Sequence, residues 1–268
     1  MAFLPLPQPF DFELTTERFR RFGRDLTSLW HEGGLHRVVG GREVRLAAAP
    51  GGVDVEPLDA ETEAVAAVVL GLPFDLDAFA AWATGDEVLA VAVPRLAGFR
   101  PSLWPDPFDS LVGTVIAQQV SLQSALAIRN RLVQRLGVRA GEAWAFPTRE
   151  RVASSDEAEL RTCGFSRAKA GYVLGIARAD LDLAALAELP DDEVKARLTA
   201  LRGVGEWTAD WFLARHLARP HAWPWGDLAL RKAVASLYGG LDVRDARARF
   251  HPHENLSAHY LLLAQRTP

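Results

Sequence analysis

The chain is poor in sulfur and lacks long apolar runs. Its 268 residues include one methionine and one cysteine, Cys163. A single cysteine excludes an internal disulfide and any cysteine-rich zinc or iron–sulfur site, so we expect no iron–sulfur cluster. No stretch approaches about 18 uninterrupted apolar residues, and the N-terminal MAFLPLPQPFDFEL lacks the basic start and apolar core of a signal peptide. These absences predict a soluble, cytoplasmic protein with no membrane partner.

The chain also lacks an excess of positive charge. Its formal net charge is −4 and its pI is about 6.0. A domain that binds nucleic acid through bulk charge usually has a pI above about 9. Any contact with DNA must therefore come from a local surface, from backbone amides or from helix dipoles.

The first hundred residues have the pattern of a small mixed α/β domain. HRVVGGREVRLAAA and GGVDVEP alternate apolar and polar residues and carry glycine pairs at 40–41 and 51–52, which predicts an antiparallel meander. PFDFEL, residues 9–14, is a candidate further strand. ETEAVAAVVLGL and DLDAFAAWAT predict helices that cover one face of the sheet.

The character of the chain changes after three prolines at 101–107. Apolar residues then recur at helical spacing nearly to the C-terminus, joined by short loops, which is typical of an all-α orthogonal bundle. We therefore predict an α+β protein with a mixed α/β domain over residues 1–98 and a helical region over 99–268. The helices are expected at 109–137 (two in series), 149–162, 166–179, 191–201, 206–217, 227–238 and 254–266.

A glycine turn separates two of these helices. LRGVGEWTADWF, residues 201–212, breaks one helix at Gly203-Val204-Gly205 and starts the next at Glu206. Glycines beside a helix N-terminus can leave several N–H groups pointing at a phosphate. A plain helix–helix turn is the favoured explanation of a lone Gly-x-Gly, so other motifs must decide.

Three further motifs accompany the glycine turn. The first, upstream, is FDSLVGTVIAQQVS, and the second, between the first motif and the turn, is AFPTRERVASSDEAELRTCGFSRAKAGYVLGIARA. The third is HAWPWGDLALRKAV, which has an aspartate about 20 residues after the turn. In order and spacing, residues 98–268 resemble the helix-hairpin-helix DNA glycosylase superfamily. The N-terminal domain resembles that of the DNA-3-methyladenine glycosylase II group. The resemblance implies two helical subdomains that flank an active-site cleft.

The resemblance assigns catalysis to Asp227. Cleavage of an N-glycosidic bond passes through an oxocarbenium-like sugar cation, which a carboxylate stabilises while it orients or deprotonates water. An ordinary helix N-cap is the alternative role for an aspartate before LALRKAV. Relatives that also nick the strand carry a lysine where this chain has Trp207, so we expect a monofunctional enzyme.

The resemblance also implies a base pocket and a wedge. Trp207, Trp211 and Phe19 are the pocket candidates, because a cationic alkylated purine attracts an aromatic face; a core stripe is the alternative for the two tryptophans. Gln119, with Gln118 beside it, takes the position of the side chain that fills the space left by the flipped base. An exposed helical face would explain the glutamines almost as well. Ala264 replaces a pocket tryptophan of the nearest relatives.

The remaining implied roles belong to the hairpin. Gly203, Gly205 and Thr208 would donate N–H groups to a DNA phosphate, and the Thr208 hydroxyl would assist. The carbonyls of Thr199, Leu201 and Val204 would hold a monovalent cation, Na⁺ or K⁺. We expect no cofactor for catalysis.

The combined interpretation is a monomeric glycosylase that acts on duplex DNA. It would excise alkylated purines of the 3-methyladenine and 7-methylguanine type, leave an abasic site for base excision repair, and be associated with the nucleoid if the source is bacterial. Three alternatives stay open: a related glycosylase for deaminated or oxidised bases, a non-catalytic helix-hairpin-helix DNA-binding protein, and a small-molecule enzyme.

Overall fold

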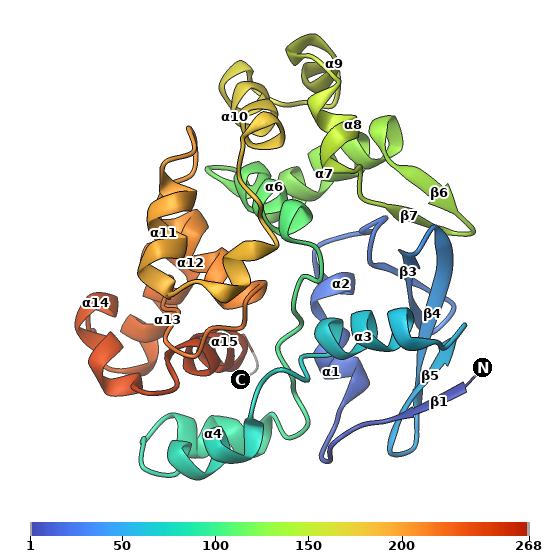
Figure 1. Ribbon diagram of the computed structural model, residues 1–268. Helices are drawn as coiled ribbons and strands as arrows, with labels where there is room; N and C mark the ends of the chain where they lie inside the picture. The colour runs from blue at the N-terminus through green and yellow to red at the C-terminus, as the bar shows by residue number, and fades with distance from the viewer. Residues whose placement is uncertain (1, 267–268) are drawn as a thin grey trace.

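A five-stranded antiparallel sheet forms one end of the molecule. The structure, a computed structural model, describes residues 2–266 (Figure 1). The strands follow the order β1-β5-β4-β3-β2, with bounds β1 (Ala2–Pro5), β2 (Leu29–His31), β3 (Gly34–Val39), β4 (Arg42–Ala49) and β5 (Gly52–Glu56). Leu46 of β4 pairs with Leu35 on one side and Val55 on the other, which aligns the apolar residues on one buried face. The predicted meander is thus present.

The candidate strand at residues 9–14 is wrong. The edge strand is β1 instead, and the later residues begin α1 (Phe12–Thr16), which α2 (Arg18–Arg21) follows. Asp11 caps α1 by accepting a hydrogen bond from the Leu14 N–H at 2.8 Å. That side-chain cap favours a helix over a strand at this point.

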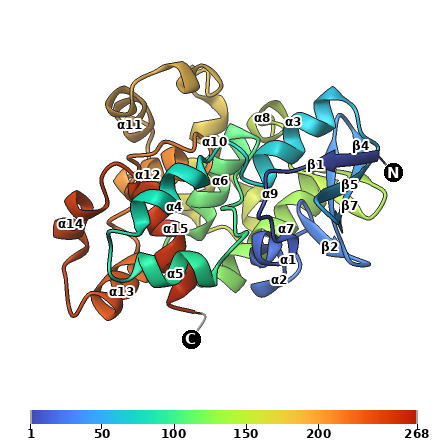
Figure 2. The ribbon, with the colours of Figure 1, turned by 90° about the horizontal axis from the view of Figure 1, so that it is seen from below.

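The two hydrophobic cores do not divide at residue 98. The sheet core runs from Leu4 to Leu70 and includes α3 (Ala60–Val69). In contrast, α4 (Leu76–Ala83) and α5 (Leu89–Arg95) belong to the helical core. The ring of Phe79 in α4 lies 4.9 Å from that of Tyr260 near the C-terminus. Figure 2 shows both helices beside α15 and away from the sheet, so α4 does not cover the sheet as predicted.

The helical region gathers into two groups, as Figure 1 shows: α6 to α10 in green to yellow, and α11 to α15 in orange to red. The predicted helix at 149–162 is two, because Asp156 caps a new helix by accepting from the Glu159 N–H. The bounds are α6 (Pro107–Ala117), α7 (Leu122–Leu136), α8 (Arg149–Ala153), α9 (Glu157–Thr162), α10 (Arg167–Arg178), η1 (Ala185–Glu188), α11 (Asp191–Thr199), α12 (Glu206–Arg215), α13 (Leu228–Leu237), α14 (Val243–Ala246), η2 (Arg247–Phe250) and α15 (Glu254–Ala264). Within residues 2–266, no helix has the length and apolar character needed to span a membrane.

A short hairpin interrupts the helices. Strands β6 (Val138–Ala140) and β7 (Ala143–Ala145) pair with each other, and the Trp144 N–H donates to the Leu26 carbonyl at 2.9 Å. The hairpin therefore connects the helical region to the N-terminal segment. Helical periodicity predicted no strands here.

A buried arginine joins the same two parts. Arg129 of α7 binds both carboxylate oxygens of Asp109 in α6, one of them at 2.8 Å. It also donates to the Thr27 hydroxyl at 2.6 Å and lies 3.7 Å from Asp25. The ring of Trp104 lies 4.7 Å from its guanidinium. This network fixes the N-terminal segment against α6 and α7.

Candidate active site

The helix-hairpin-helix is formed by α11, residues 200–205 and α12. Lys195 of α11 and the buried Asp210 of α12 form an ion pair at 2.6 Å, which holds the helices together. Gly203 has φ +91°, and a Cβ there would lie 2.1 Å from Cγ of Tyr172. Only glycine fits such a position. The tight turn at Gly203 is therefore a requirement of the fold itself.

Gly205 differs from Gly203. It has φ −102°, which any residue adopts, and a Cβ there would meet no atom within 4 Å. Its side of the hairpin is open, so the chain itself gives no packing reason for glycine. Close approach of an external group such as a phosphate is a reason that remains. Among the described residues, neither the Gly203 nor the Gly205 N–H donates to another backbone group.

Thr208 is poorly suited to its predicted role. Its side chain is buried, and its hydroxyl accepts a hydrogen bond from Nε2 of Gln118 at 3.0 Å. Its N–H donates to the Gly205 carbonyl at 3.0 Å. Both groups already have partners inside the protein. The role of Thr208 as a phosphate donor stays a prediction.

The carbonyls predicted to hold a cation lie where α11 ends. Thr199 is the last residue of α11, and the last carbonyls of a helix lack intrahelical partners. The Leu201 carbonyl accepts from the Val204 N–H at 3.0 Å, which leaves it one lone pair. Carbonyl oxygens at the negative end of a helix dipole attract a cation, which suits Thr199 and Leu201, whereas Val204 lies in the turn just before α12. The cation site stays a prediction.

The two glutamines of AQQVS differ in environment. Nε2 of Gln118 donates to the Gly203 carbonyl at 2.9 Å as well as to Thr208, so Gln118 fastens α6 to the hairpin. Nζ of Lys169 in α10 donates to the backbone carbonyl of Gln118 at 2.6 Å. Gln118 is therefore not available as a wedge. Gln119 is exposed and has φ +54°, in the turn between α6 and α7.

Asp227 caps α13 with one oxygen and binds two indoles with the other. Its Oδ1 accepts from the N–H groups of Ala229 and Leu230 at 2.9 and 3.0 Å. Its Oδ2 accepts from Nε1 of Trp207 at 3.2 Å and from Nε1 of Trp211 at 3.1 Å. The N-cap role and the site role therefore coexist, and four donors fix the orientation of the carboxylate.

Asp227 faces a cavity of about 290 Å³. Trp207, Trp211 and Phe19 contribute to its wall, together with Phe22. The wall is a meeting point of α1, α2, α6, α7, α12, α13 and α15. The structure thus brings the catalytic candidate and the three aromatic candidates to one cavity.

Sequence reasoning missed five arginines in the wall: Arg18, Arg37, Arg129, Arg215 and Arg266. Burial lowers the pKa of Arg215 to about 9 and that of Arg18 to about 10. The Arg215 guanidinium lies 3.7 Å from the centre of the Trp211 ring, so that indole already has a cation on its face. Burial also lowers the pKa of Arg266, which lies close enough to Asp227 for the carboxylate to counteract that shift. The cavity is more cationic than the aromatic pocket that the sequence suggested.

The C-terminal helix contributes polar groups through a face that excludes Ala264. Four residues of α15 and its end contribute to the wall: His259, Leu262, Leu263 and Arg266. Their spacing places them on one side of the helix. Ala264 lies off that face and does not contribute to the wall. His259 is buried between the rings of Trp211 and Phe74. Burial, with Arg215 nearby, holds the pKa of His259 well below its usual value.

Local signals for the missed residues were weak. Arg215 follows Trp211 by four residues, which places the two on one helix face. Arg18, His259 and Arg266 come from distant segments, and no local pattern marks their convergence.

Leu122 is 50% exposed in the cavity wall, and Leu228 beside Asp227 is 62% exposed. Both are apolar side chains left at the surface beside the cavity.

Known proteins are similar to this chain in sequence. The chain is 29% identical over 171 residues to the DNA-3-methyladenine glycosylase of Bacillus subtilis (strain 168), covering 61% of this chain and 56% of that protein. It is 30% identical over 138 residues to DNA-3-methyladenine glycosylase 2 of Escherichia coli (strain K12), covering 48% and 49%. The chain thus spans about half the length of these curated relatives.

Solved structures match more completely. A 3-methyladenine DNA glycosylase from Archaeoglobus fulgidus superposes with a TM-score of 0.87 at 28% identity, covering 100% of this chain and 99% of that one. The Clostridium acetobutylicum 8-oxoguanine glycosylase/lyase, solved with double-stranded DNA, gives 0.80 at 21% identity over 96% and 92%, a likeness of fold alone. The family described as HhH-GPD superfamily base excision DNA repair protein matches residues 112–250, just over half of the chain. The α+β prediction is confirmed, and the chain belongs to the HhH-GPD superfamily.

Proposed function

We propose that this protein is a monofunctional DNA glycosylase that removes alkylated purines from duplex DNA and leaves an abasic site. The observation that carries the proposal is the fixed carboxylate of Asp227 in the wall of an aromatic cavity. The names of the B. subtilis and E. coli relatives support the substrate class. The protein would act as a monomer in base excision repair.

The geometry favours charge stabilisation over proton abstraction by Asp227. Each of its oxygens already accepts two hydrogen bonds, so no lone pair is free to take a proton from water. Its negative charge remains beside the sugar as the oxocarbenium ion develops. An alkylated purine is a good leaving group, so a strong base and a dedicated general acid are both unnecessary.

Trp207 supports hydrolysis without strand nicking. It stands where strand-nicking relatives of this superfamily carry a lysine, and its indole N–H is bound to Asp227. Among the described residues, the cavity wall includes no lysine. Without an amine, no Schiff base with the sugar can form.

The surface around the cavity supports binding of DNA with an extruded base. The open N–H groups of Gly203 and Gly205 would bind a phosphate, aided by a monovalent cation on the neighbouring carbonyls. Gln119 projects from the turn before α7 and would enter the space that the base leaves. Leu122 and Leu228 would cover the neighbouring bases. Hydrogen bonds from backbone N–H groups to phosphate would allow a protein of net charge −4 to bind DNA.

The test is base release from methylated duplex DNA, followed by mass spectrometry. We expect the wild-type chain to release 3-methyladenine and 7-methylguanine, and Asp227→Asn to slow release at least 100-fold. Asparagine is also a good N-cap, so this variant should keep α13 and its melting temperature. Failure of the wild type to release either base contradicts the substrate class. Equal release by Asp227→Asn contradicts the role of the carboxylate, and nicked DNA contradicts the monofunctional assignment.

The arginines of the cavity favour a second candidate, excision of neutral bases with carbonyl groups. Guanidinium groups repel a cationic base and donate to carbonyl oxygens. Arg215 occupies one face of Trp211, where a cationic purine would otherwise stack. Deaminated and oxidised purines offer such oxygens at their edges.

A panel of duplexes with single lesions separates the two candidates. Hypoxanthine and 8-oxoguanine duplexes are compared with 7-methylguanine duplexes, for the wild type and for Arg215→Leu. If neutral lesions are the substrates, their release exceeds that of 7-methylguanine and falls in the variant. If alkylated purines are the substrates, the wild type prefers 7-methylguanine, and removal of the cation maintains or increases its release.

A further inference from the structure

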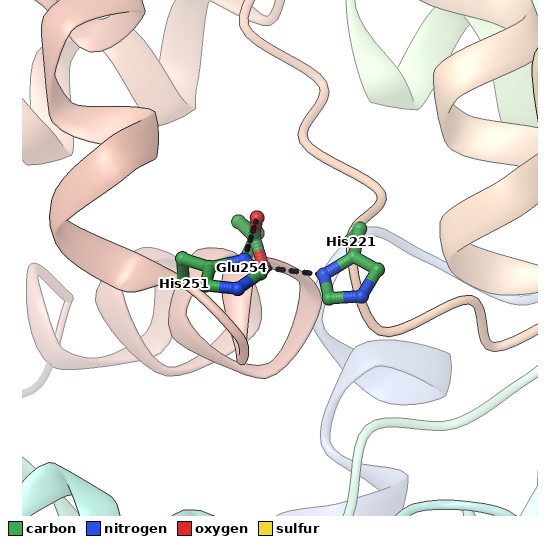
Figure 3. A group of neighbouring side chains, drawn as sticks. All are labelled: His221, His251 and Glu254. Carbon is green, nitrogen blue, oxygen red and sulfur yellow. Dashed lines mark hydrogen bonds and ion pairs between the residues drawn. The ribbon is translucent and has the colours of Figure 1, made fainter.

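Two histidines and a glutamate form a cluster that the proposed function does not use. His221 lies in the loop after α12, His251 follows η2, and Glu254 is the first residue of α15. Figure 3 shows both imidazoles turned toward the carboxylate. Nδ1 of His221 lies 3.1 Å from Oε2 of Glu254, and Nδ1 of His251 lies 3.4 Å from Oε1. None of the three residues contributes to the cavity that contains Asp227.

The ligand types and spacing are those of a transition-metal site. Two imidazoles and a carboxylate are a common protein ligand set for Zn²⁺. Bonds of about 2.0–2.2 Å in tetrahedral geometry separate neighbouring ligand atoms by about 3.4 Å. The two nitrogen–oxygen distances, 3.1 and 3.4 Å, are close to that separation, although each histidine contacts a different oxygen of Glu254. One ligand atom from each residue lies within 4.8 Å of the others.

Burial distinguishes this cluster from a chance surface contact. The Glu254 side chain is 4% exposed, whereas those of His221 and His251 are 44% and 65% exposed. Among the described residues, the hydrogen-bond partners of its carboxylate are these two imidazoles. The anion is therefore built into the fold, and the exposed imidazoles leave room for water as a further ligand.

We propose that His221, His251 and Glu254 bind a divalent transition metal ion of the Zn²⁺ type. The ion would fasten the loop at 217–226 to the start of α15. Asn255 already links these parts, because its N–H donates to the Pro220 carbonyl at 2.9 Å and its side chain donates to the Arg219 carbonyl at 3.0 Å. That loop leads directly to Asp227, so the metal would stabilise the segment that positions the carboxylate without touching the reacting atoms.

The test is calorimetric titration of the metal-free protein with ZnCl₂, alongside thermal unfolding. We expect one equivalent to bind, with a higher melting temperature, and at least tenfold weaker binding in His221→Gln and in His251→Gln. Both histidines are exposed, so the variants should melt like the wild type without metal. His31→Gln, which removes another partly exposed histidine, should bind Zn²⁺ normally.

X-ray absorption at the zinc edge supplies a second measurement. We expect two imidazole ligands at about 2.0–2.1 Å. Absence of stoichiometric binding, binding retained by the double variant His221→Gln/His251→Gln, loss of binding in His31→Gln, or a spectrum with fewer than two imidazoles would each overturn the proposal. None of these results depends on glycosylase activity.

Discussion

At the scale of single residues, the two indoles that bind Asp227 act as positioning groups. Their Nε1 atoms both donate to Oδ2, while the backbone of α13 binds Oδ1. The carboxylate is therefore oriented before any substrate arrives, which is the condition for effective electrostatic stabilisation. The tryptophans therefore position the aspartate, in addition to the base stacking that we propose for them.

We predict that Trp207→Phe and Trp211→Phe each slow base release in single-turnover assays. Each change keeps an aromatic ring and removes one N–H bonded to a charged group, worth about 1.5–3 kcal/mol, or roughly 10- to 100-fold in rate. Trp223→Phe is the matched control, because its Nε1 donates to the Val243 carbonyl in the core. Unchanged rates in both site variants would refute the positioning role.

We also predict a pH dependence of stability that belongs to His259. Its folded-state pKa lies well below 6.5, so between those values the unfolded chain binds a proton that the folded chain does not. The contribution to the free energy of unfolding is present above pH 6.5 and lost as pH falls below it, by up to about 1.4 kcal/mol per pH unit. Urea unfolding measures the free energy of unfolding at several pH values between 5 and 7, and its change with pH should be smaller in His259→Leu than in the wild type. The control His31→Gln, at a partly exposed histidine, should show the wild-type change with pH. An unaltered change with pH in His259→Leu would contradict the assignment.

At the scale of elements, the hairpin glycines have separate tasks. Gly203 is required by backbone conformation and by the Tyr172 ring, whereas Gly205 borders open space. Gly203 is required for folding, whereas Gly205 leaves open space for the phosphate contact that we propose. Substitution can therefore separate stability from binding.

We predict that Gly203→Ala is strongly destabilising, because it combines a positive φ with a steric clash. The positive φ alone costs about 1–2 kcal/mol. Gly205→Ala should melt within a few degrees of the wild type but bind duplex DNA at least tenfold more weakly. Thermal unfolding and fluorescence anisotropy with an abasic-site duplex measure the two effects. Normal DNA affinity in Gly205→Ala would show that no phosphate approaches that residue.

Local patterns predicted the elements better than their packing. The meander is marked by alternating apolar residues, and the turn between α11 and α12 is marked by two glycines. Each of these signals lies within a few consecutive residues. Helix α4 was identified, but periodicity reveals which face is apolar and not which surface receives it. Strands β6 and β7 have three residues each, too few for a detectable alternation. The arginines of the cavity converge from separate elements, which a single sequence does not disclose.

At the scale of the whole molecule, one buried network joins the two cores. Arg129 connects α7 to Asp109 in α6 and to Thr27 in the N-terminal segment. That segment also supplies Phe19 and Arg18 to the cavity wall. The sheet domain therefore contributes to the site, and its attachment matters for the geometry there.

We predict that Arg129→Met lowers the free energy of unfolding by about 3–5 kcal/mol, because Asp109 is left buried without its partner. The double variant Arg129→Met/Asp109→Leu should recover much of the loss, since the carboxylate of Asp109 is removed together with its partner. Denaturant unfolding followed by tryptophan fluorescence measures both. A double variant no more stable than Arg129→Met would mean that the network acts through its shape and not its charges.

The capping role of Asp227 has an evolutionary consequence. Selection for a stable α13 alone would retain an aspartate or asparagine there, even in a relative without the proposed repair activity. Aspartate at this position is therefore an ambiguous marker of catalysis among relatives. The pair of indoles that binds its second oxygen has no part in the cap, so their joint presence is the more informative signature of a working enzyme.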